Sequence, residues 1–201
     1  MCVTGWAPLR VARAMTATQR KGPIRALLLV HFAVFQITWF AAVYAAAQCK
    51  PMWSLVYVGG AIGWHLALAA KPWREAALVA ITCLIGGVVE SLLGLMGQVR
   101  FDCGMGIGGV APLWLVGMWG LLAICLNVSL RWLRGRWLLC ALLGALGGPL
   151  AFASGAALGA AQFANATAAL WAIALAWSMA FPALVRLSMR LDGFGFVDAR
   201  A

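Results

Sequence analysis

Six long apolar stretches separated by short basic connections limit what this chain can fold into more than any other feature of its sequence. Each stretch has about the 20 residues that an α-helix needs to cross the hydrocarbon core of a bilayer. Only 10% of the 201 residues are charged, whereas a soluble domain carries about 25%. The sequence therefore predicts an all-α polytopic membrane protein, a bundle of six transmembrane helices. The predicted spans are residues 26–47, 52–70, 75–97, 111–131, 137–158 and 168–187.

The basic residues predict the orientation of this bundle. Of the 15 Lys and Arg residues, only Lys50 and Arg100 fall on one side of the predicted spans. Because cytoplasmic loops carry the excess of Lys and Arg, both termini are expected in the cytoplasm. The chain then divides into a basic N-terminal segment (1–25), a transmembrane domain (26–187) and a C-terminal tail (188–201). Despite the net charge of +10, basic residues interleaved between spans favour membrane lipids and not a nucleic acid as partner.

One acidic residue, Glu90, lies in the interior of a predicted span. Small neighbours let another helix approach, so its carboxylate is expected to point into protein. A charge in hydrocarbon costs at least about 2.5–3.5 kcal/mol, which favours a use as catalytic acid or base or as a proton or cation site. The alternative is a structural carboxylate, neutral or paired with Tyr57 or Arg100. The neighbours of Glu90 at helical spacing are Cys83, Gly86, Gly87, Gly94 and Gly97.

A second group of polar residues is expected nearer the cytoplasm. At 1.5 Å per residue, His31, His65 and Asn127 lie at one depth, roughly 6–8 Å below the boundary. Glu90 is roughly 15 Å away from Asn127 in depth, so the two are not expected to be partners. This layer either holds a polar head group or links helices by hydrogen bonds. Two histidines on different helices give no local ligand spacing, so neither a metal nor a cofactor is predicted.

These considerations define the candidate site. Glu90 is the candidate catalytic residue. The candidate substrate-binding residues are His31, Gln36, Tyr57, His65, Trp114 and Asn127.

Two of the six cysteines are expected to form a disulfide. Cys49 and Cys103 fall in the two charged connections predicted to lie outside the cytoplasm, where disulfides persist. Two free thiols are the alternative.

Several short stretches, spread over about residues 26–187, carry a family resemblance. They are Phe35-Gln36, Trp39-Phe40, Gly86 to Ser91, Pro112-Leu113-Trp114, Asn127 to Leu133 and Gly147 to Leu150. Their order and spacing resemble a bacterial family of uncharacterised six-span inner-membrane proteins, domain of unknown function 2878. That family usually has Asp at the position of Glu90 and often His at that of Val128. The resemblance implies a location in the bacterial inner membrane. Members of the family are often encoded beside fatty-acid-modifying methyltransferases, which implies lipid metabolism by association only.

Three functions are compatible with these features. The leading one is an enzyme or accessory factor of lipid metabolism that handles a lipidic small molecule, with Glu90 as acid or base. The second is a small proton-coupled transporter that uses the same carboxylate. The third is a structural or assembly subunit that binds a protein partner through its glycine-rich helix faces.

Overall fold

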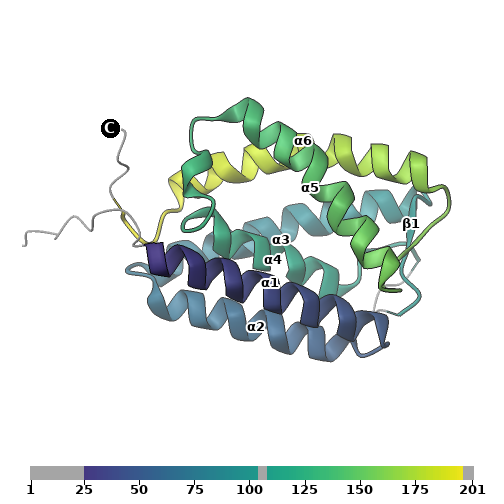
Figure 1. The fold of residues 1–201 in the computed structure, drawn as a ribbon, viewed down its shortest axis with the longest axis horizontal. Helices are drawn as coiled ribbons and strands as arrows, with labels where there is room; N and C mark the ends of the chain where they lie inside the picture. Colours follow the sequence, from purple (N-terminus) through teal and green to yellow (C-terminus); the bar gives the residue numbers. More distant parts are fainter. Residues whose placement is uncertain (1–24, 104–107, 197–201) are drawn as a thin grey trace, which may run out of the picture.

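A computed structural model describes residues 25–103 and 108–196, and this part of the chain contains six α-helices. In Figure 1 they run alongside one another as three pairs, α1 with α2, α3 with α4, and α5 with α6. Of these, α1, α3, α5 and α6 are long and apolar enough to cross a membrane, as expected of a multi-pass membrane protein. The helices are α1 (Arg25–Ala47), α2 (Pro51–Leu68), α3 (Pro72–Leu95), α4 (Leu113–Leu126), α5 (Trp137–Ala157) and α6 (Ala166–Arg190).

The helix boundaries follow from residues that start or stop helices. Pro51 and Pro72 begin α2 and α3, where a missing backbone N–H costs nothing. The side chain of Asn165 caps α6 by accepting a hydrogen bond from the backbone N–H of Ala168. Gly97 follows the end of α3 with a φ of 70°, a conformation that glycine adopts without strain. The connection from α1 to α2 is only residues 48–50, whereas residues 96–112 join α3 to α4.

The fourth helix lies at the centre of the bundle and is shorter than the predicted span 111–131. It has 14 residues and packs against α1, α2, α3 and α6. The chain leaves the helix at Asn127, whose side chain binds Glu75 and the backbone carbonyl of Leu191. Turns and a short 3₁₀-helix, η1 (Arg131–Leu133), then lead to α5.

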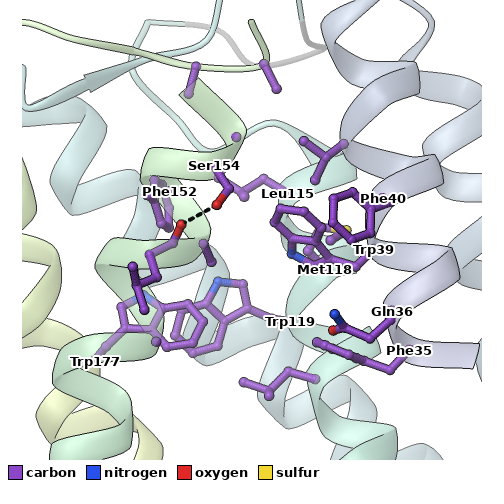
Figure 2. A pocket seen from close by; sticks show the side chains of 18 of the residues that line it. Phe35, Gln36, Trp39, Phe40, Leu115, Met118, Trp119, Phe152, Ser154 and Trp177 are labelled. Atoms are coloured by element: carbon purple, nitrogen blue, oxygen red, sulfur yellow. Dashed lines mark hydrogen bonds between the residues drawn. The ribbon is translucent and has the colours of Figure 1, made fainter. Parts of the chain in front are cut away.

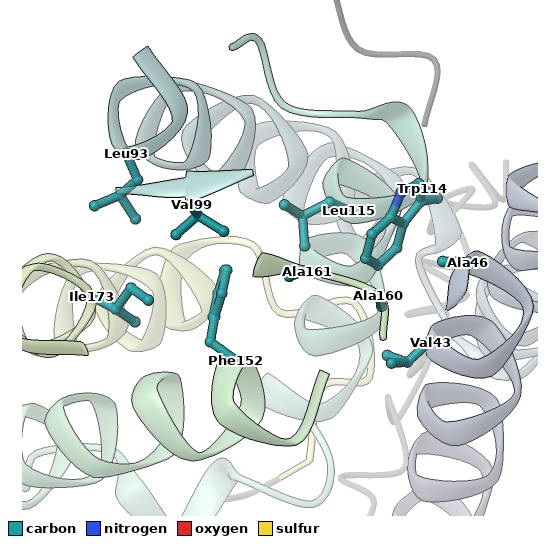
Figure 3. Close-up of a cluster of buried hydrophobic side chains, with 10 residues drawn as sticks. All are labelled: Val43, Ala46, Leu93, Val99, Trp114, Leu115, Phe152, Ala160, Ala161 and Ile173. Atoms are coloured by element: carbon teal, nitrogen blue, oxygen red, sulfur yellow. The ribbon is translucent and has the colours of Figure 1, made fainter. Parts of the chain in front are cut away.

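At one end of the bundle, here called the disulfide end, a small hydrophobic cluster joins the helices. Cys49 and Cys103, the pair named above, form a disulfide with their Cα atoms 4.9 Å apart. Two short antiparallel strands, β1 (Val99–Arg100) and β2 (Gln162–Phe163), tie the α3–α4 and α5–α6 connections together. Figure 3 shows the buried cluster beneath them. Its members are Val43, Ala46, Leu93, Val99, Trp114, Leu115, Phe152, Ala160, Ala161 and Ile173.

The opposite end of the bundle, here called the basic end, carries Arg25, Lys71, Arg74, Arg131, Arg134, Arg136 and Arg190. Here the C-terminal residues turn back into the bundle. The tail is predicted from residue 188, and α6 ends at Arg190. Residues 191–196 then pack against α3: the backbone N–H of Lys71 donates to the carbonyl of Gly193 at 2.8 Å. The predicted N-terminal segment lies almost entirely outside the described residues.

Candidate functional site

The first polar cluster is built around Glu75, a fully buried residue in the first turn of α3. Its Oε2 lies 3.0 Å from Nε2 of His65 on α2. Its Oε1 accepts hydrogen bonds from the Asn127 side-chain amide at 2.8 Å and from the backbone N–H of Gly193 at 2.6 Å. Nδ1 of His65 lies 3.2 Å from Nε2 of His31, on α1. One carboxylate therefore links α1, α2, α3, the end of α4 and the C-terminal segment.

Leu27, His31, His65 and Glu75 form a series of three hydrogen bonds. These bonds need one more proton than two neutral histidines and an ionised Glu75 carry. Nδ1 of His31 faces the carbonyl of Leu27 at 3.1 Å, and that oxygen only accepts. An ionised Glu75 also only accepts, so its bond to His65 needs a proton on His65 Nε2. The bond between the two rings needs a third proton, whereas two neutral imidazoles carry two. All three bonds form together only when one imidazole is doubly protonated or Glu75 is a neutral acid.

A salt-bridge cluster closes the same end of the bundle. Asp192 binds Arg131 and lies 3.1 Å from Arg134, whose guanidinium also donates to the side-chain oxygen of Asn127 at 2.6 Å. Burial alone would raise the pKa of the Asp192 carboxyl. Hydrogen bonds from Arg131 and the Gly195 backbone, with the charges of Arg131 and Arg134, outweigh burial, so this pKa lies below its usual value. The C-terminal segment is therefore held by charge as well as by the contact with Glu75.

Two phenylalanines of this segment cover the histidines. The ring of Phe194 lies 5.0 Å from that of His65, and the rings of Phe194 and Phe196 stack at 5.4 Å. The polar cluster is thus sealed, since His31, His65 and Glu75 are fully buried. No group of three or more His, Cys, Asp or Glu residues within the described ranges is arranged to hold a metal ion.

Glu90 occupies a different level of the bundle, and its environment is formed by tryptophans. It is 1% exposed, and its Oε1 accepts a hydrogen bond from the indole N–H of Trp119 at 3.2 Å. The ring of Trp119 packs against that of Trp177 at 4.7 Å. The proposed partners do not reach it, because Tyr57 stacks near Trp53 on the surface and Arg100 is exposed on β1. As expected, Glu90 and Asn127 share no hydrogen bond.

Glycines make room for these two tryptophans. A Cβ atom on Gly86, one helical turn before Glu90, would lie 2.0 Å from the Trp119 ring. A Cβ atom on Gly148 of α5 would lie 2.5 Å from the Trp177 ring. The glycine-rich face of the third span therefore serves a close contact inside this chain.

Beside the tryptophans lies a cavity of about 490 Å³ between α1, α4, α5 and α6 (Figure 2). This volume falls within the range of small-molecule sites, about 300–1,000 Å³. Its wall is mostly aromatic and aliphatic, and no charged side chain is among the described residues that line it. α1 and α5 flank it without packing closely on each other, and the lining residues Phe40 and Leu150 are exposed on the outer surface. The aromatic residues of the wall are Phe35, Trp39, Phe40, Phe101, Trp114, Trp119, Phe152, Trp177 and Phe181.

The predicted site residues thus separate into three groups. His31, His65 and Asn127 meet at the sealed cluster around Glu75. Gln36 and Trp114 line the cavity, and Glu90 stands behind its wall without lining it. Tyr57 belongs to neither place.

Sequence reasoning missed Glu75 and Trp119. The apolar pattern places Glu75 at the first residue of the span 75–97, beside Arg74, where a carboxylate is ordinarily solvated. A signal was present, since Pro72 is a residue type that begins helices and would place Glu75 one turn inside the helix, closer to the depth estimated for His65. No comparable signal existed for Trp119, one of 11 tryptophans in the chain.

Similarity to a known protein family covers most of this bundle. The model of a family described as a protein of unknown function (DUF2878) matches residues 28–183. The chain belongs to this family. The match runs from α1 into α6, so the cavity and the carboxylates Glu75 and Glu90 all lie within the family region. No curated protein and no solved structure matches the chain.

Proposed function

We propose that this protein binds the hydrocarbon part of a lipidic molecule in the aromatic cavity, as an enzyme or accessory factor of lipid metabolism in the bacterial inner membrane. The observation that carries the proposal is a cavity without charged lining residues that lies between two helices with apolar outer surfaces. Such a wall binds acyl or isoprenoid chains through dispersion contacts. The gap between α1 and α5 lets such a chain enter sideways from the bilayer.

Orientation and span number are parts of the same proposal. All described basic residues except Lys50 and Arg100 lie at the basic end, which favours its placement in the cytoplasm. Six membrane-embedded helices, with α2 and the central α4 sheltered by the longer ones, are consistent with the order of the bundle. The lipid would then enter near mid-membrane.

Filling the cavity tests the proposal. Gly147 lines it, and a Cβ atom there meets nothing within 4 Å, so phenylalanine is expected to enter the cavity without disturbing the backbone. We expect Gly147→Phe to reduce photolabelling of cavity peptides by a diazirine-bearing hexadecanol at least about tenfold, equivalent to about 1.4 kcal/mol of binding energy. The measurement is mass spectrometry of labelled protein in lipid nanodiscs.

Gly63→Phe on α2 is the matched control. Gly63 is also an exposed helical glycine with open space at its Cβ, and it does not line the cavity. Labelling that is unaffected by Gly147→Phe, or reduced equally by both variants, would contradict the proposal.

Glu90 fits this proposal as a positioning residue that fixes Trp119 in the cavity wall. Glu90→Gln keeps an oxygen that accepts the Trp119 N–H, so we expect labelling within about twofold of the original protein. Glu90→Leu leaves this N–H buried without an acceptor, which costs about 1–3 kcal/mol and loosens the wall. Labelling and thermal unfolding of both variants measure this.

Catalysis by Glu90 itself and proton-coupled transport make the opposite prediction for glutamine, because both need a carboxylate at this position that exchanges a proton. Loss of a lipid product, or of substrate-dependent proton flux in proteoliposomes, in Glu90→Gln with unchanged unfolding temperature would favour them. They have less structural support, because Glu90 is buried behind Trp119 and does not line the cavity.

A further inference from the structure

The polar groups of the cavity wall are few, and those with unused hydrogen-bonding capacity identify the ligand's chemistry. Gln36, from the middle of α1, lines the cavity. Figure 2 shows its side-chain amide pointing away from α1, toward the side on which Trp119 lies. This amide makes no hydrogen bond within the described part of the chain. Because an amide offers both a donor and an acceptor, it matches a group such as a hydroxyl, an ester or a ketone.

A second polar group points to the same chemistry. Trp114 lines the cavity, is 3% exposed, and its indole N–H is buried with no acceptor among the described residues. A buried donor without a partner costs about 1–3 kcal/mol, so it is ordinarily satisfied by something. Ser154, the other polar side chain of the wall besides the indoles, already donates to the carbonyl of Leu150 at 2.7 Å. The wall therefore offers hydrogen bonds to oxygen atoms and no positive charge.

The absence of a countercharge decides between neutral and anionic ligands. None of the described lining residues is Lys, Arg or His, and the lining residue Trp119 donates a hydrogen bond to the acid Glu90 behind the wall. An ionised carboxylate or phosphate placed in such surroundings loses its hydration without a partner, which is far costlier than burying a neutral hydroxyl. A charged head group would have to remain outside the cavity.

We infer that the cavity takes an uncharged amphiphile, or the uncharged part of one: a long acyl or isoprenoid chain with a hydroxyl, ester or keto oxygen that binds Gln36. The inference rests on the proposed function and adds the class of ligand. It assigns Gln36 the role of distinguishing an oxygen-bearing chain from a plain hydrocarbon. Exclusion of anionic groups is a property of the whole wall.

The test compares four diazirine-bearing probes with the same chain in nanodiscs: a hydrocarbon, a primary alcohol, a methyl ester and a carboxylic acid kept ionised at pH 9. We expect cavity labelling by the alcohol and the ester to exceed that by the hydrocarbon about two- to tenfold, the range of one net hydrogen bond. Labelling by the ionised acid is expected to be at least about tenfold weaker than by the alcohol.

Gln36→Leu is expected to abolish the preference for alcohol and ester while the hydrocarbon still labels the cavity. Retained hydrocarbon labelling shows that the variant is folded. Preference for the ionised acid, or equal labelling by all four probes, would overturn the inference and leave the proposed function intact. A preference that survives Gln36→Leu would also overturn it. Failure of every probe to label the cavity would remove the proposed function itself, and the inference with it.

Discussion

Replacing Glu75 with leucine is expected to lower the free energy of unfolding by about 3–5 kcal/mol, the usual result of removing one partner from a buried polar pair. Leucine leaves the side-chain N–H of Asn127 and the backbone N–H of Gly193 without their acceptor. It also leaves the two-histidine chain without its final acceptor. Unfolding in detergent, followed by circular dichroism, measures the loss.

Glutamine at the same position is expected to cost no more than about 1.5 kcal/mol. Its oxygen accepts from Asn127 and Gly193, and its amide N–H donates to Nε2 of His65. His65 then donates to His31, and His31 donates to the carbonyl of Leu27, so two neutral imidazoles suffice. If glutamine destabilised the protein as much as leucine, the negative charge of Glu75 and not its pattern of acceptors would hold the cluster together. The proton count would then be wrong.

The second large effect is expected from adding a single methyl group at Gly86. The Cβ atom of Gly86→Ala would lie 2.0 Å from the Trp119 ring, too close for either group to stay in place. A displaced Trp119 loses its hydrogen bond to Glu90 and its packing on Trp177. Overpacking of this kind costs about 1–3 kcal/mol, and here it should also remove the near-ultraviolet circular dichroism of the paired tryptophans.

The next residue provides a matched control for this substitution. A Cβ atom on Gly87 would lie 3.5 Å from Val116, which is ordinary van der Waals contact. Because alanine favours helix over glycine by about 1 kcal/mol, Gly87→Ala is expected to be neutral or stabilising. Equal behaviour of the two variants would show that the third helix does not pack on Trp119 as described.

Much of the fold was accessible from the sequence, because apolar runs and proline-marked breaks are local signals. The helices lie close to the predicted spans, and the main difference is at the end of α4. There the outcome depended on Asn127 binding Glu75 and Leu191, which are distant in sequence. Depth counting along separate helices correctly grouped His31, His65 and Asn127, since rise per residue is constant.

The candidate site was harder to predict from the sequence, because the direction in which a side chain points and its exclusion from solvent depend on how the helices pack. Depth does not show which way a residue faces, so nothing in the sequence distinguished Gln36, which lines the cavity, from Tyr57, which lies on the surface. The structural alternative for Glu90 was a neutral carboxylate or one paired with Tyr57 or Arg100, whereas its hydrogen-bond partner is the indole of Trp119. Family membership adds no chemistry, since the family is described only as a protein of unknown function.

The shortness of α4 has a consequence for how the protein is made. A helix of 14 residues rises about 21 Å, less than the roughly 30 Å of a bilayer core, so its ends cannot reach both aqueous surfaces unaided. In the proposed arrangement of six membrane-embedded helices, the irregular backbone after Leu126 would lie within the membrane, where it is tolerated only if protein surrounds it. During synthesis, α4 should therefore leave the translocon against α1, α2 and α3, which precede it. Ribosome-bound chains that lack α1 to α3 should fail to integrate this segment.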